Sequence, residues 1–288
     1  MLRRLMLSVL QIALGVALGL PLLLWAFQDK LIFHPQPIDP ARVNALQRAH
    51  PDLQSWWLET PEGRQHAWLL PARDSAGTSR AKPLVIYFGG NAEEVSWLMQ
   101  DTTQVPEERL WHWLFIDYRG FGQSAGAPSQ KALVADALQW FDHAAKQATV
   151  DRNRIMLVGR SLGSGVAVQL AAARPVARVA LTTPFDSLTA VAQFHYPLIP
   201  VRWLLRHPFD SLALAPLQKM PLLVLAGERD TLIPPERARR LHAAWRGEKA
   251  WHLLDQADHN NISAHPDYVR LLRRFLTVGA FESPRSAN

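Results

Sequence analysis

The chain has 288 residues, of which 48% are hydrophobic and 19% are charged, a composition that excludes a disordered chain and a coiled coil and predicts one substantial core. It has no cysteine, which excludes disulfides, a thiolate nucleophile and cysteine-ligated metal centres. The net charge of +6, from 31 Lys and Arg against 25 Asp and Glu, is scattered rather than clustered, so no nucleic-acid partner is expected.

The first predicted element is an apolar helix over residues 5–27. Its 23 residues carry no charge and would form a helix about 34 Å long, enough to cross a hydrocarbon core of roughly 30 Å. A cleaved signal peptide and a buried core helix are the alternatives. The run is long, ends in bulky side chains and precedes no clear Ala-x-Ala site, which favours an uncleaved signal anchor that spans the membrane.

Charges on the two sides of this helix predict its orientation. Arg3 and Arg4 precede it, whereas the two charges that follow it have opposite signs and cancel. The positive-inside rule therefore predicts that residues 1–4 form a cytoplasmic tail. The body of the protein is expected on the non-cytoplasmic, periplasmic side of the inner membrane, anchored by a single pass.

After the helix, residues 28–52 are expected to form a proline-containing neck. Three prolines between Phe33 and Pro40 are expected to block regular structure there and to stiffen the segment against the domain or the bilayer. The globular domain is expected over residues 53–279, and residues 280–288 are expected to form a C-terminal tail.

Within the domain, strand-like apolar runs alternate with amphipathic segments of helical length. Several later strands are continuous apolar runs, typical of strands covered on both faces by helices. We therefore predict an α/β fold with a mostly parallel, doubly wound sheet of eight strands that begins with an antiparallel hairpin. The expected strands are 55–59, 66–70, 84–88, 114–118, 155–158, 176–181, 222–225 and 250–254, and the expected helices are 93–103, 131–147, 162–174, 236–245 and 266–276.

The pentapeptide Pro-Phe-Asp-Ser-Leu occurs twice, at residues 184–188 and 208–212. In both copies Asp and Ser stand just before an apolar run, which is the pattern of a helix N-terminus. We therefore interpret the two copies as helix starts rather than as a duplicated site.

The sequence Gly159-Arg160-Ser161-Leu162-Gly163 joins the strand at 155–158 to a helix rich in small residues. This strand–turn–helix context is that of a nucleophile elbow, which presents a serine hydroxyl above the sheet. The glycines would relieve crowding between strand and helix, and the helix N-terminus would stabilise a developing oxyanion. Ser161 is the predicted nucleophile, and an ordinary glycine-rich turn is the alternative.

A serine nucleophile needs an imidazole to take its proton and a carboxylate to orient that imidazole. In nucleophile-elbow enzymes the acid and then the histidine follow the serine along the chain. His259 is the predicted base, because among the histidines after Ser161 it alone occupies a loop directly after a strand. Asp230, at the end of a buried strand, is the predicted acid and is preferred over Glu228, with Asp258 as the second candidate. Charged residues of surface loops are the alternative interpretation.

The segment Gly89-Gly90-Asn91-Ala92 connects the strand at 84–88 to the helix expected from Glu93. Glycines at such a turn let backbone amides approach a substrate oxygen. The backbone amides of Asn91 and Leu162 are therefore the expected donors of an oxyanion hole, and a plain strand-to-helix turn is the alternative.

Together these motifs resemble the alpha/beta-hydrolase superfamily, most closely its membrane-anchored branch with a small lid. That branch comprises the YfhR-type bacterial hydrolases, the Bem-type eukaryotic hydrolases and the protein depalmitoylases. The resemblance implies the same triad and oxyanion donors and a structural role for the loop at 117–129. Relatives usually carry His-Gly-Asn where this chain has Gly89-Gly90-Asn91, so its oxyanion loop is expected to differ in shape while its amides remain available. The matching segments are 90–92, 117–124, 126–129, 159–163, 227–230, 233–234 and 258–259.

This fold inserts its lid at residues 184–216, which we call the lid segment. Its 33 residues are few for a lid and are rich in large apolar side chains. A short apolar lid predicts a shallow site, near the membrane, that is open to an acyl chain.

The sequence thus predicts a serine hydrolase that cleaves acyl esters or thioesters through a triad of Ser161, Asp230 and His259 and an acyl-enzyme intermediate. An aminopeptidase-type amide hydrolase and a non-catalytic, membrane-tethered binding domain are the alternatives. The sequence has no metal-ligand cluster, phosphate loop or dinucleotide fingerprint, so no cofactor is expected. The expected partners are a small or lipid-like acyl substrate and the membrane, and the sequence does not indicate an oligomeric state.

Overall fold

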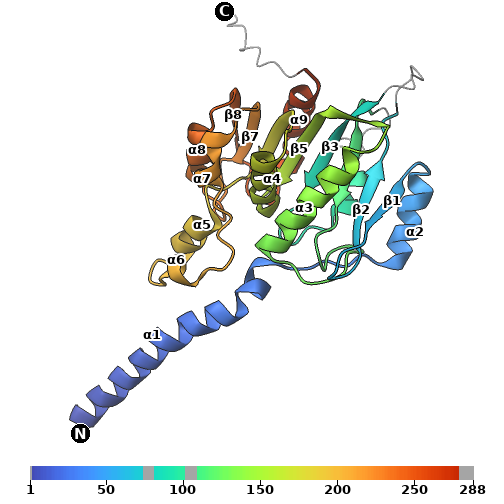
Figure 1. Cartoon of the computed structure of the whole chain (residues 1–288). Coiled ribbons are helices and arrows are strands. Elements are labelled where there is room, and N and C mark those ends of the chain that lie inside the picture. Colours follow the sequence, from blue (N-terminus) through green and yellow to red (C-terminus); the bar gives the residue numbers. More distant parts are fainter. Residues whose placement is uncertain (1, 74–80, 101–108, 279–288) are drawn as a thin grey trace, which may run out of the picture.

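The computed structural model describes residues 2–73, 81–100 and 109–278, and these contain eight strands in one sheet. The sheet order is β1-β2-β4-β3-β5-β6-β7-β8 (Figure 1). The first two strands form the expected antiparallel hairpin, β2 is antiparallel to β4, and the other neighbours are parallel, which confirms the predicted sheet. The strands are β1 (Gln54–Leu58), β2 (Gln65–Leu70), β3 (Lys82–Phe88), β4 (His112–Ile116), β5 (Val150–Arg160), β6 (Arg178–Thr182), β7 (Leu222–Gly227) and β8 (Lys249–Leu254).

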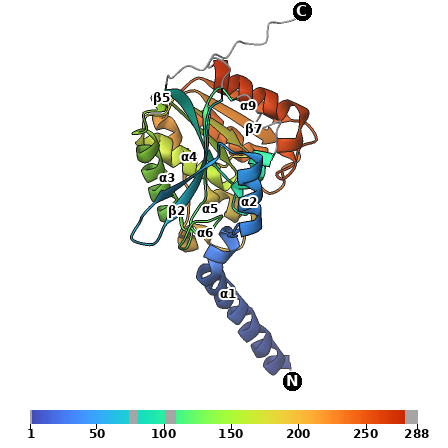
Figure 2. The ribbon, with the colours of Figure 1, turned by 90° about the vertical axis from the view of Figure 1, so that its right-hand side faces the viewer.

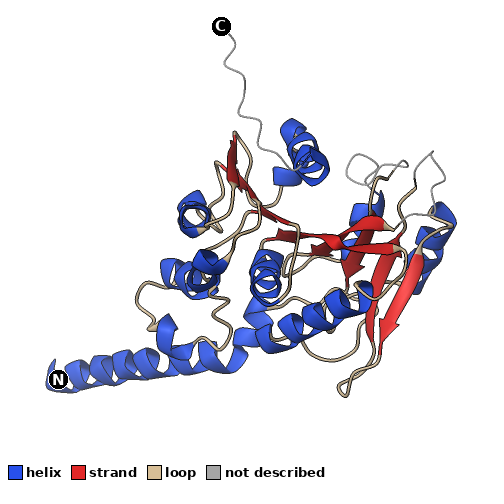
Figure 3. Cartoon of the chain, turned by 45° about the horizontal axis from the view of Figure 1, so that its top comes forward, coloured by secondary structure: helices blue, strands red, loops and turns tan. Residues whose placement is uncertain are grey.

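Helices cover both faces of this sheet. One layer contains α3 (Gln130–Ala144), α4 (Leu162–Ala173) and α8 (Pro235–Ala244). The other layer contains α2 (Pro40–Ala49) and α9 (Pro266–Val278). Figure 2 shows α3 and α4 on one side of the strands and α2 and α9 on the other, and Figure 3 shows the red strands between the blue helices.

Alternate side chains of the central strand β3 enter the two cores. Ile86 and Phe88 pack in the core that contains Trp140 of α3, and Val85 packs in the core that contains Leu46 of α2. Because neither face of the strand meets water, the strand is a continuous apolar run rather than an alternating one.

The N-terminal helix α1 (Leu2–Ile32) projects from the body and is longer than the expected 5–27 (Figure 1). Within the described residues it is the one helix long and apolar enough to cross a membrane, and none of its most apolar part is buried against the rest of the chain. A signal sequence would pass the same test.

The expected neck, residues 28–52, contains regular structure in its second half. The side chain of Asp39 accepts a hydrogen bond of 2.7 Å from the backbone amide of Ala41 and so caps α2. Pro40 begins this helix rather than blocking it, because proline lacks an amide that the first turn would leave unpaired. Leu46 is fully buried, so α2 packs as part of the globular body.

The prediction of an α-helix over residues 93–103 is wrong for the described part of that range. A 3₁₀ helix, η1 (Val95–Gln100), stands there, and residues 101–103 lie outside the described residues, as do 279 and the expected tail 280–288. The carboxylates of Glu93 and Glu94 explain the difference. The Glu93 carboxylate accepts the backbone amide of Gly90 at 2.8 Å, and the Glu94 carboxylate accepts that of Ser96 at 2.9 Å. These bonds favour a tight turn at the point where the α-helix was expected to start.

The lid segment carries three short helices, of which the first and the third start at the two pentapeptides. The Ser187 hydroxyl accepts a hydrogen bond from Ala190 N at 3.1 Å, and the Asp210 carboxylate accepts one from Ala213 N at 3.1 Å. Both copies of the pentapeptide are therefore helix N-termini, as predicted. The helices are α5 (Leu188–His195), α6 (Val201–Leu204) and α7 (Ser211–Leu214), followed by the 3₁₀ helix η2 (Ala215–Leu217); a further 3₁₀ helix, η3 (Ile262–Ala264), precedes α9.

Candidate active site

Ser161 stands in a strained turn between β5 and α4. Its φ of 51° and ψ of −116° are unusual for a residue with a side chain and match the strand–turn–helix context expected of a nucleophile elbow. Glycines make the turn possible. A Cβ at Gly163 would overlap the carbonyl oxygen of Phe88, and a Cβ at Gly159 would lie 2.5 Å from the carbonyl oxygen of Gly163.

The structure brings Ser161, His259 and Asp230 together in one hydrogen-bonded chain. His259 Nε2 lies 2.9 Å from Ser161 Oγ, and His259 Nδ1 lies 2.7 Å from Asp230 Oδ2. An ionised carboxylate can only accept, so Nδ1 carries the proton and Nε2 accepts from the serine hydroxyl. All three residues are buried, which shields these bonds from water.

The carboxylate of Asp230 is held at the end of β7 by its own loop. Its Oδ1 accepts the backbone amides of Leu232, at 3.0 Å, and Ile233, at 2.7 Å. These two bonds orient the group so that Oδ2 faces the imidazole of His259. Such support from neighbouring groups fixes the position of an acidic partner.

The two other candidate acids are engaged elsewhere. The Asp258 carboxylate accepts the backbone amides of Asn261, at 2.9 Å, and Asn260, at 2.8 Å, and these bonds lower the pKa of its exposed carboxyl. The Glu228 carboxylate accepts the backbone amide of Gln256 at 3.1 Å. Asp258 therefore stabilises its own turn, and Glu228 stabilises the turn that follows β8.

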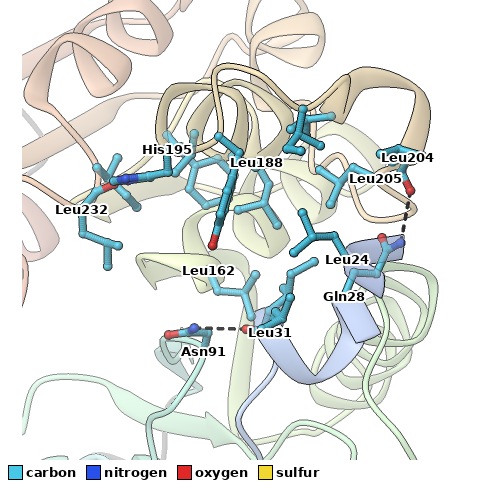
Figure 4. Close-up of a pocket in the computed structure, with 18 of the residues that line it drawn as sticks. Leu24, Gln28, Leu31, Asn91, Leu162, Leu188, His195, Leu204, Leu205 and Leu232 are labelled. Carbon is cyan, nitrogen blue, oxygen red and sulfur yellow. Dashed lines mark hydrogen bonds between the residues drawn. The ribbon is translucent and has the colours of Figure 1, made fainter. Parts of the chain in front are cut away.

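The two expected oxyanion donors lie beside the serine. Asn91 and Leu162 line the same cavity as Ser161, and Figure 4 shows their side chains close together at one end of it. Leu162 is the first residue of α4, so its amide has no acceptor within the helix. A Cβ at Gly89 would lie 3.0 Å from Cγ1 of Val95, so the histidine usual at this position would require Val95 to move.

Arg160 and Glu93 link the three loops around the serine, and sequence reasoning did not identify either residue. The Arg160 guanidinium donates to Glu93 Oε2 at 3.1 Å and to the carbonyl oxygen of His259 at 3.2 Å. The same Glu93 oxygen accepts the amide of Gly90, in the oxyanion loop. The available signal was Arg160 itself, a charged residue at the end of an apolar strand and directly before the serine.

The loop at 117–129 has the structural role that the resemblance implied. His66 Nδ1 lies 2.7 Å from Asp117 Oδ2, and the same oxygen accepts the backbone amide of Gln123 at 2.9 Å. Gly122, at φ 52°, is needed because a Cβ there would overlap the Asp117 carboxylate. Tyr118 extends from this loop and donates to the carbonyl oxygen of Gly89 at 3.1 Å.

Ser161 opens onto a cavity of about 530 Å³ between the lid segment and the end of α1. In Figure 4, Leu24, Gln28 and Leu31 of α1 face Leu188 and Leu205 of the lid segment across this space. The other residues that line the cavity are Trp25, Ile32, Asn91, Ser161, Leu162, Phe185, Val191, Ala192, His195, Tyr196, Ile199, Val201, Leu204, Leu232 and Ile233.

This lining is mainly apolar and carries no carboxylate among the described residues. His195, which sequence reasoning set aside, lines the cavity, but its Nε2 is bonded to the carbonyl oxygen of Leu232 at 2.8 Å. Across the described ranges, no group of three or more His, Asp or Glu side chains could hold a metal ion. The cavity is therefore suited to an apolar ligand that reaches the serine.

Comparison with known proteins identifies the family of this chain. Residues 85–265 match the family model described as "Alpha/beta hydrolase domain". An uncharacterised protein of Mycobacterium tuberculosis is 34% identical over 95% of this chain and 96% of its own. Protein YfhR of Salmonella typhi is 27% identical over 81% of this chain and 79% of its own.

Two further matches carry activities in their names. "Lysophosphatidylserine lipase ABHD12" of Rattus norvegicus is 27% identical over 85% of this chain and 66% of its own. The solved structure of a Pyrococcus furiosus esterase superposes with a TM-score of 0.64, at 17% identity, over 85% of this chain and 96% of its own. At that identity the structural match is evidence for the fold alone.

Proposed function

The chain belongs to the alpha/beta-hydrolase family, and we propose that it is a serine hydrolase that cleaves acyl esters or thioesters. The observation that carries the proposal is the chain of hydrogen bonds from Asp230 through His259 to Ser161, which lines an apolar cavity. Serine hydrolases need a nucleophile, a base and an orienting acid in this order.

The first half-reaction transfers the acyl group to the enzyme. Ser161 Oγ attacks the substrate carbonyl carbon while His259 Nε2 takes the hydroxyl proton, and Asp230 stabilises the imidazolium that forms. The amides of Asn91 and Leu162 are proposed to donate to the oxyanion of the tetrahedral intermediate. When the intermediate collapses, His259 returns its proton to the alcohol or thiol that leaves, and the acyl group remains on Ser161.

The second half-reaction releases the acid. A water molecule gives a proton to His259 Nε2 and attacks the acyl-enzyme carbonyl, so a second oxyanion forms in the same position. Its collapse breaks the bond to Ser161 Oγ, and His259 protonates that oxygen. The free enzyme is regenerated without a cofactor.

The cavity favours an acyl chain over an aminoacyl group. An aminopeptidase needs a group that recognises the substrate's charged amine, and a buried ammonium requires an ionic or hydrogen-bonding partner. No carboxylate lines the cavity among the described residues. The relative named a lysophosphatidylserine lipase supports an ester of a lipid as the substrate.

A fluorophosphonate probe and a pair of substrates test this proposal. The full-length protein should be labelled by the probe and should hydrolyse para-nitrophenyl esters faster than aminoacyl para-nitroanilides. The absence of labelling would favour a non-catalytic binding domain. Faster cleavage of the aminoacyl amides would favour an aminopeptidase.

We expect Asp230→Asn to lower kcat for ester hydrolysis by up to about 10⁴-fold, because the amide neither fixes the tautomer nor stabilises the charge of His259. Asp258→Asn is the matched control and should have a much smaller effect, since the Asp258 carboxylate bonds to its own turn. Steady-state kinetics on a para-nitrophenyl ester measure both. The reverse order of effects would assign the acid to Asp258.

We also propose that residues 5–27 of α1 span the inner membrane and stay attached, with residues 1–4 in the cytoplasm and the remainder in the periplasm. The contacts of the helix with the body support retention, because Gln28 is buried and bonded to the lid segment. Leu24 and Trp25 also line the cavity, so cleavage after them would remove part of its lining.

This topology predicts that protease added to intact spheroplasts digests the hydrolase domain, because the two N-terminal arginines are retained in the cytoplasm. Mass spectrometry should find a mature chain that still contains α1. Neutralising Arg3 and Arg4 together should weaken the orientation. Digestion only after lysis would locate the domain in the cytoplasm, and a mature chain beginning near Asp29 would identify a cleaved signal peptide.

A further inference from the structure

The end of α1 is fastened to the lid segment by a buried amide side chain. Gln28 is 5% exposed, and its Nε2 donates to the carbonyl oxygen of Leu204 at 3.1 Å. Its Oε1 accepts the backbone amide of Arg206 at 2.7 Å. Both ends of the side chain are therefore hydrogen-bonded to the backbone of the lid segment, which fixes the rotation of the helix against the lid.

Charged and aromatic contacts continue this attachment along the next turn. Asp29 Oδ1 lies 2.7 Å from His207 Nε2 and 3.0 Å from the guanidinium of Arg206. The ring of Phe33 is buried and packs edge-on against His207, with 5.2 Å between the ring centroids. The last turn of α1 is thus packed as a part of the body.

The same end of α1 is bonded to the oxyanion loop. The side-chain amide of Asn91 donates to the carbonyl oxygen of Ile32 at 3.1 Å (Figure 4), and the backbone amide of His34 donates to the carbonyl oxygen of Asn91 at 2.9 Å. The helix is therefore held at a set distance from both the lid segment and Ser161.

Apolar side chains of α1 are left facing the cavity between these attachments. Leu31 lines the cavity next to the bonded residue Ile32 and is 53% exposed. Leu24 lines it seven residues earlier, which is about 10 Å farther along the helix axis. A ligand that covers Leu31, outside the span proposed above, removes apolar surface from water, and a chain long enough to reach Leu24 gains further van der Waals contact along the helix.

We propose that residues 24–32 of α1 form a wall of the acyl site and that Leu24 selects for long acyl chains. The proposal rests on the proposed hydrolase function and adds a specificity-determining role for the membrane helix. A short acyl group on Ser161 stays near Leu31, whereas a long one runs along α1 toward the bilayer and contacts Leu24. The substrate class is accordingly an ester or thioester of a long acyl chain.

The experiment uses the full-length protein in phosphatidylcholine vesicles with para-nitrophenyl palmitate and para-nitrophenyl acetate. Leu24→Trp fills the outer part of the cavity, so the ratio of kcat/KM for palmitate to that for acetate should fall by about tenfold or more. Leu23→Trp is the matched control: Leu23 adjoins Leu24, is 57% exposed and is not part of the lining, so the ratio should stay at the wild-type value.

Leu24→Ala is a second variant in case the tryptophan perturbs folding. It removes the apolar contact without adding volume, so the palmitate-to-acetate ratio should again fall, by less than in Leu24→Trp, and Leu23→Ala should keep it. Equal ratios in the Leu24 and Leu23 variants would overturn the role of α1 while leaving hydrolysis intact. Failure of the wild-type protein to cleave either ester or to react with a fluorophosphonate would instead overturn the hydrolase function.

Discussion

Replacing Ser161 with alanine is expected to abolish ester hydrolysis, with kcat lower by as much as about 10⁶-fold. This factor corresponds to roughly 8 kcal/mol of lost transition-state stabilisation. The effect should be this large because the acyl-enzyme route needs the hydroxyl that lies 2.9 Å from His259 Nε2. The remaining binding groups can only assist direct attack by water. Ester turnover by the purified variant, relative to wild type, measures the loss.

The fold of the Ser161→Ala variant should be unchanged, because alanine fits where serine stands and the backbone strain is the same. Circular dichroism and thermal unfolding test this point. Ser164→Ala is a useful control: Ser164 is fully buried one turn later in α4, and its hydroxyl bonds to the carbonyl oxygen of Ser161 rather than to a triad residue. Full ester turnover in a folded Ser161→Ala variant would show that another residue is the nucleophile.

The sheet was predictable because most of its inner strands are buried on both faces. A run such as Leu222 to Leu225 must be apolar throughout to pack between two helical layers, so the pattern needs no knowledge of distant contacts. The family match confirms the fold class and the resemblance read from the motifs. In the lid segment only the N-termini of α5 and α7 could be predicted, because the two pentapeptides supply their capping residues; α6 has no such signal.

Elements whose form depends on hydrogen bonds between side chains and backbone amides were harder to predict. The apolar pattern after Glu93 suits an α-helix, but the bonds from Gly90 N and Ser96 N to the two glutamates favour a 3₁₀ turn. Similarly, Pro40 was interpreted as a breaker, although the Asp39 cap makes it the first residue of a helix. Local hydrogen-bond geometry decided both cases.

The candidate site was predictable where chemistry dictates residue type and order. The structure brings the three predicted triad residues within hydrogen-bond distance, and their catalytic roles stay predictions. Arg160 and the lining residues of α1 escaped sequence reasoning for a physical reason. Their functions depend on contacts with segments far away in the chain, such as the carbonyl oxygen of His259 and the lid segment. The apolar composition of α1 is already explained by a membrane span, so it gave no sign that the helix lines a cavity.

Replacing His259 with alanine is expected to inactivate the protein to a degree comparable with Ser161→Ala. Without the imidazole, no other described side chain bonded to Ser161 Oγ can take its proton, and the hydroxyl is a poor nucleophile at neutral pH. Reaction with the fluorophosphonate should fall with ester turnover, since both depend on the activated serine. Labelling and ester turnover should therefore fall together. A defect in substrate binding would reduce ester turnover alone.

His252→Ala and His265→Ala are the matched controls and should retain most activity. His252 lies within β8, and His265 has a structural role: its Nε2 lies 3.1 Å from Asp255 Oδ1, and its Nδ1 accepts the backbone amide of Asp267 at 3.1 Å at the start of α9. Loss of that cap should lower stability by about 1 kcal/mol and leave kcat near the wild-type value. If His252→Ala were the inactive variant while His259→Ala kept its turnover, the base would lie in the strand rather than in the loop that follows it. The 2.7 Å contact between His259 and Asp230 would then be structural.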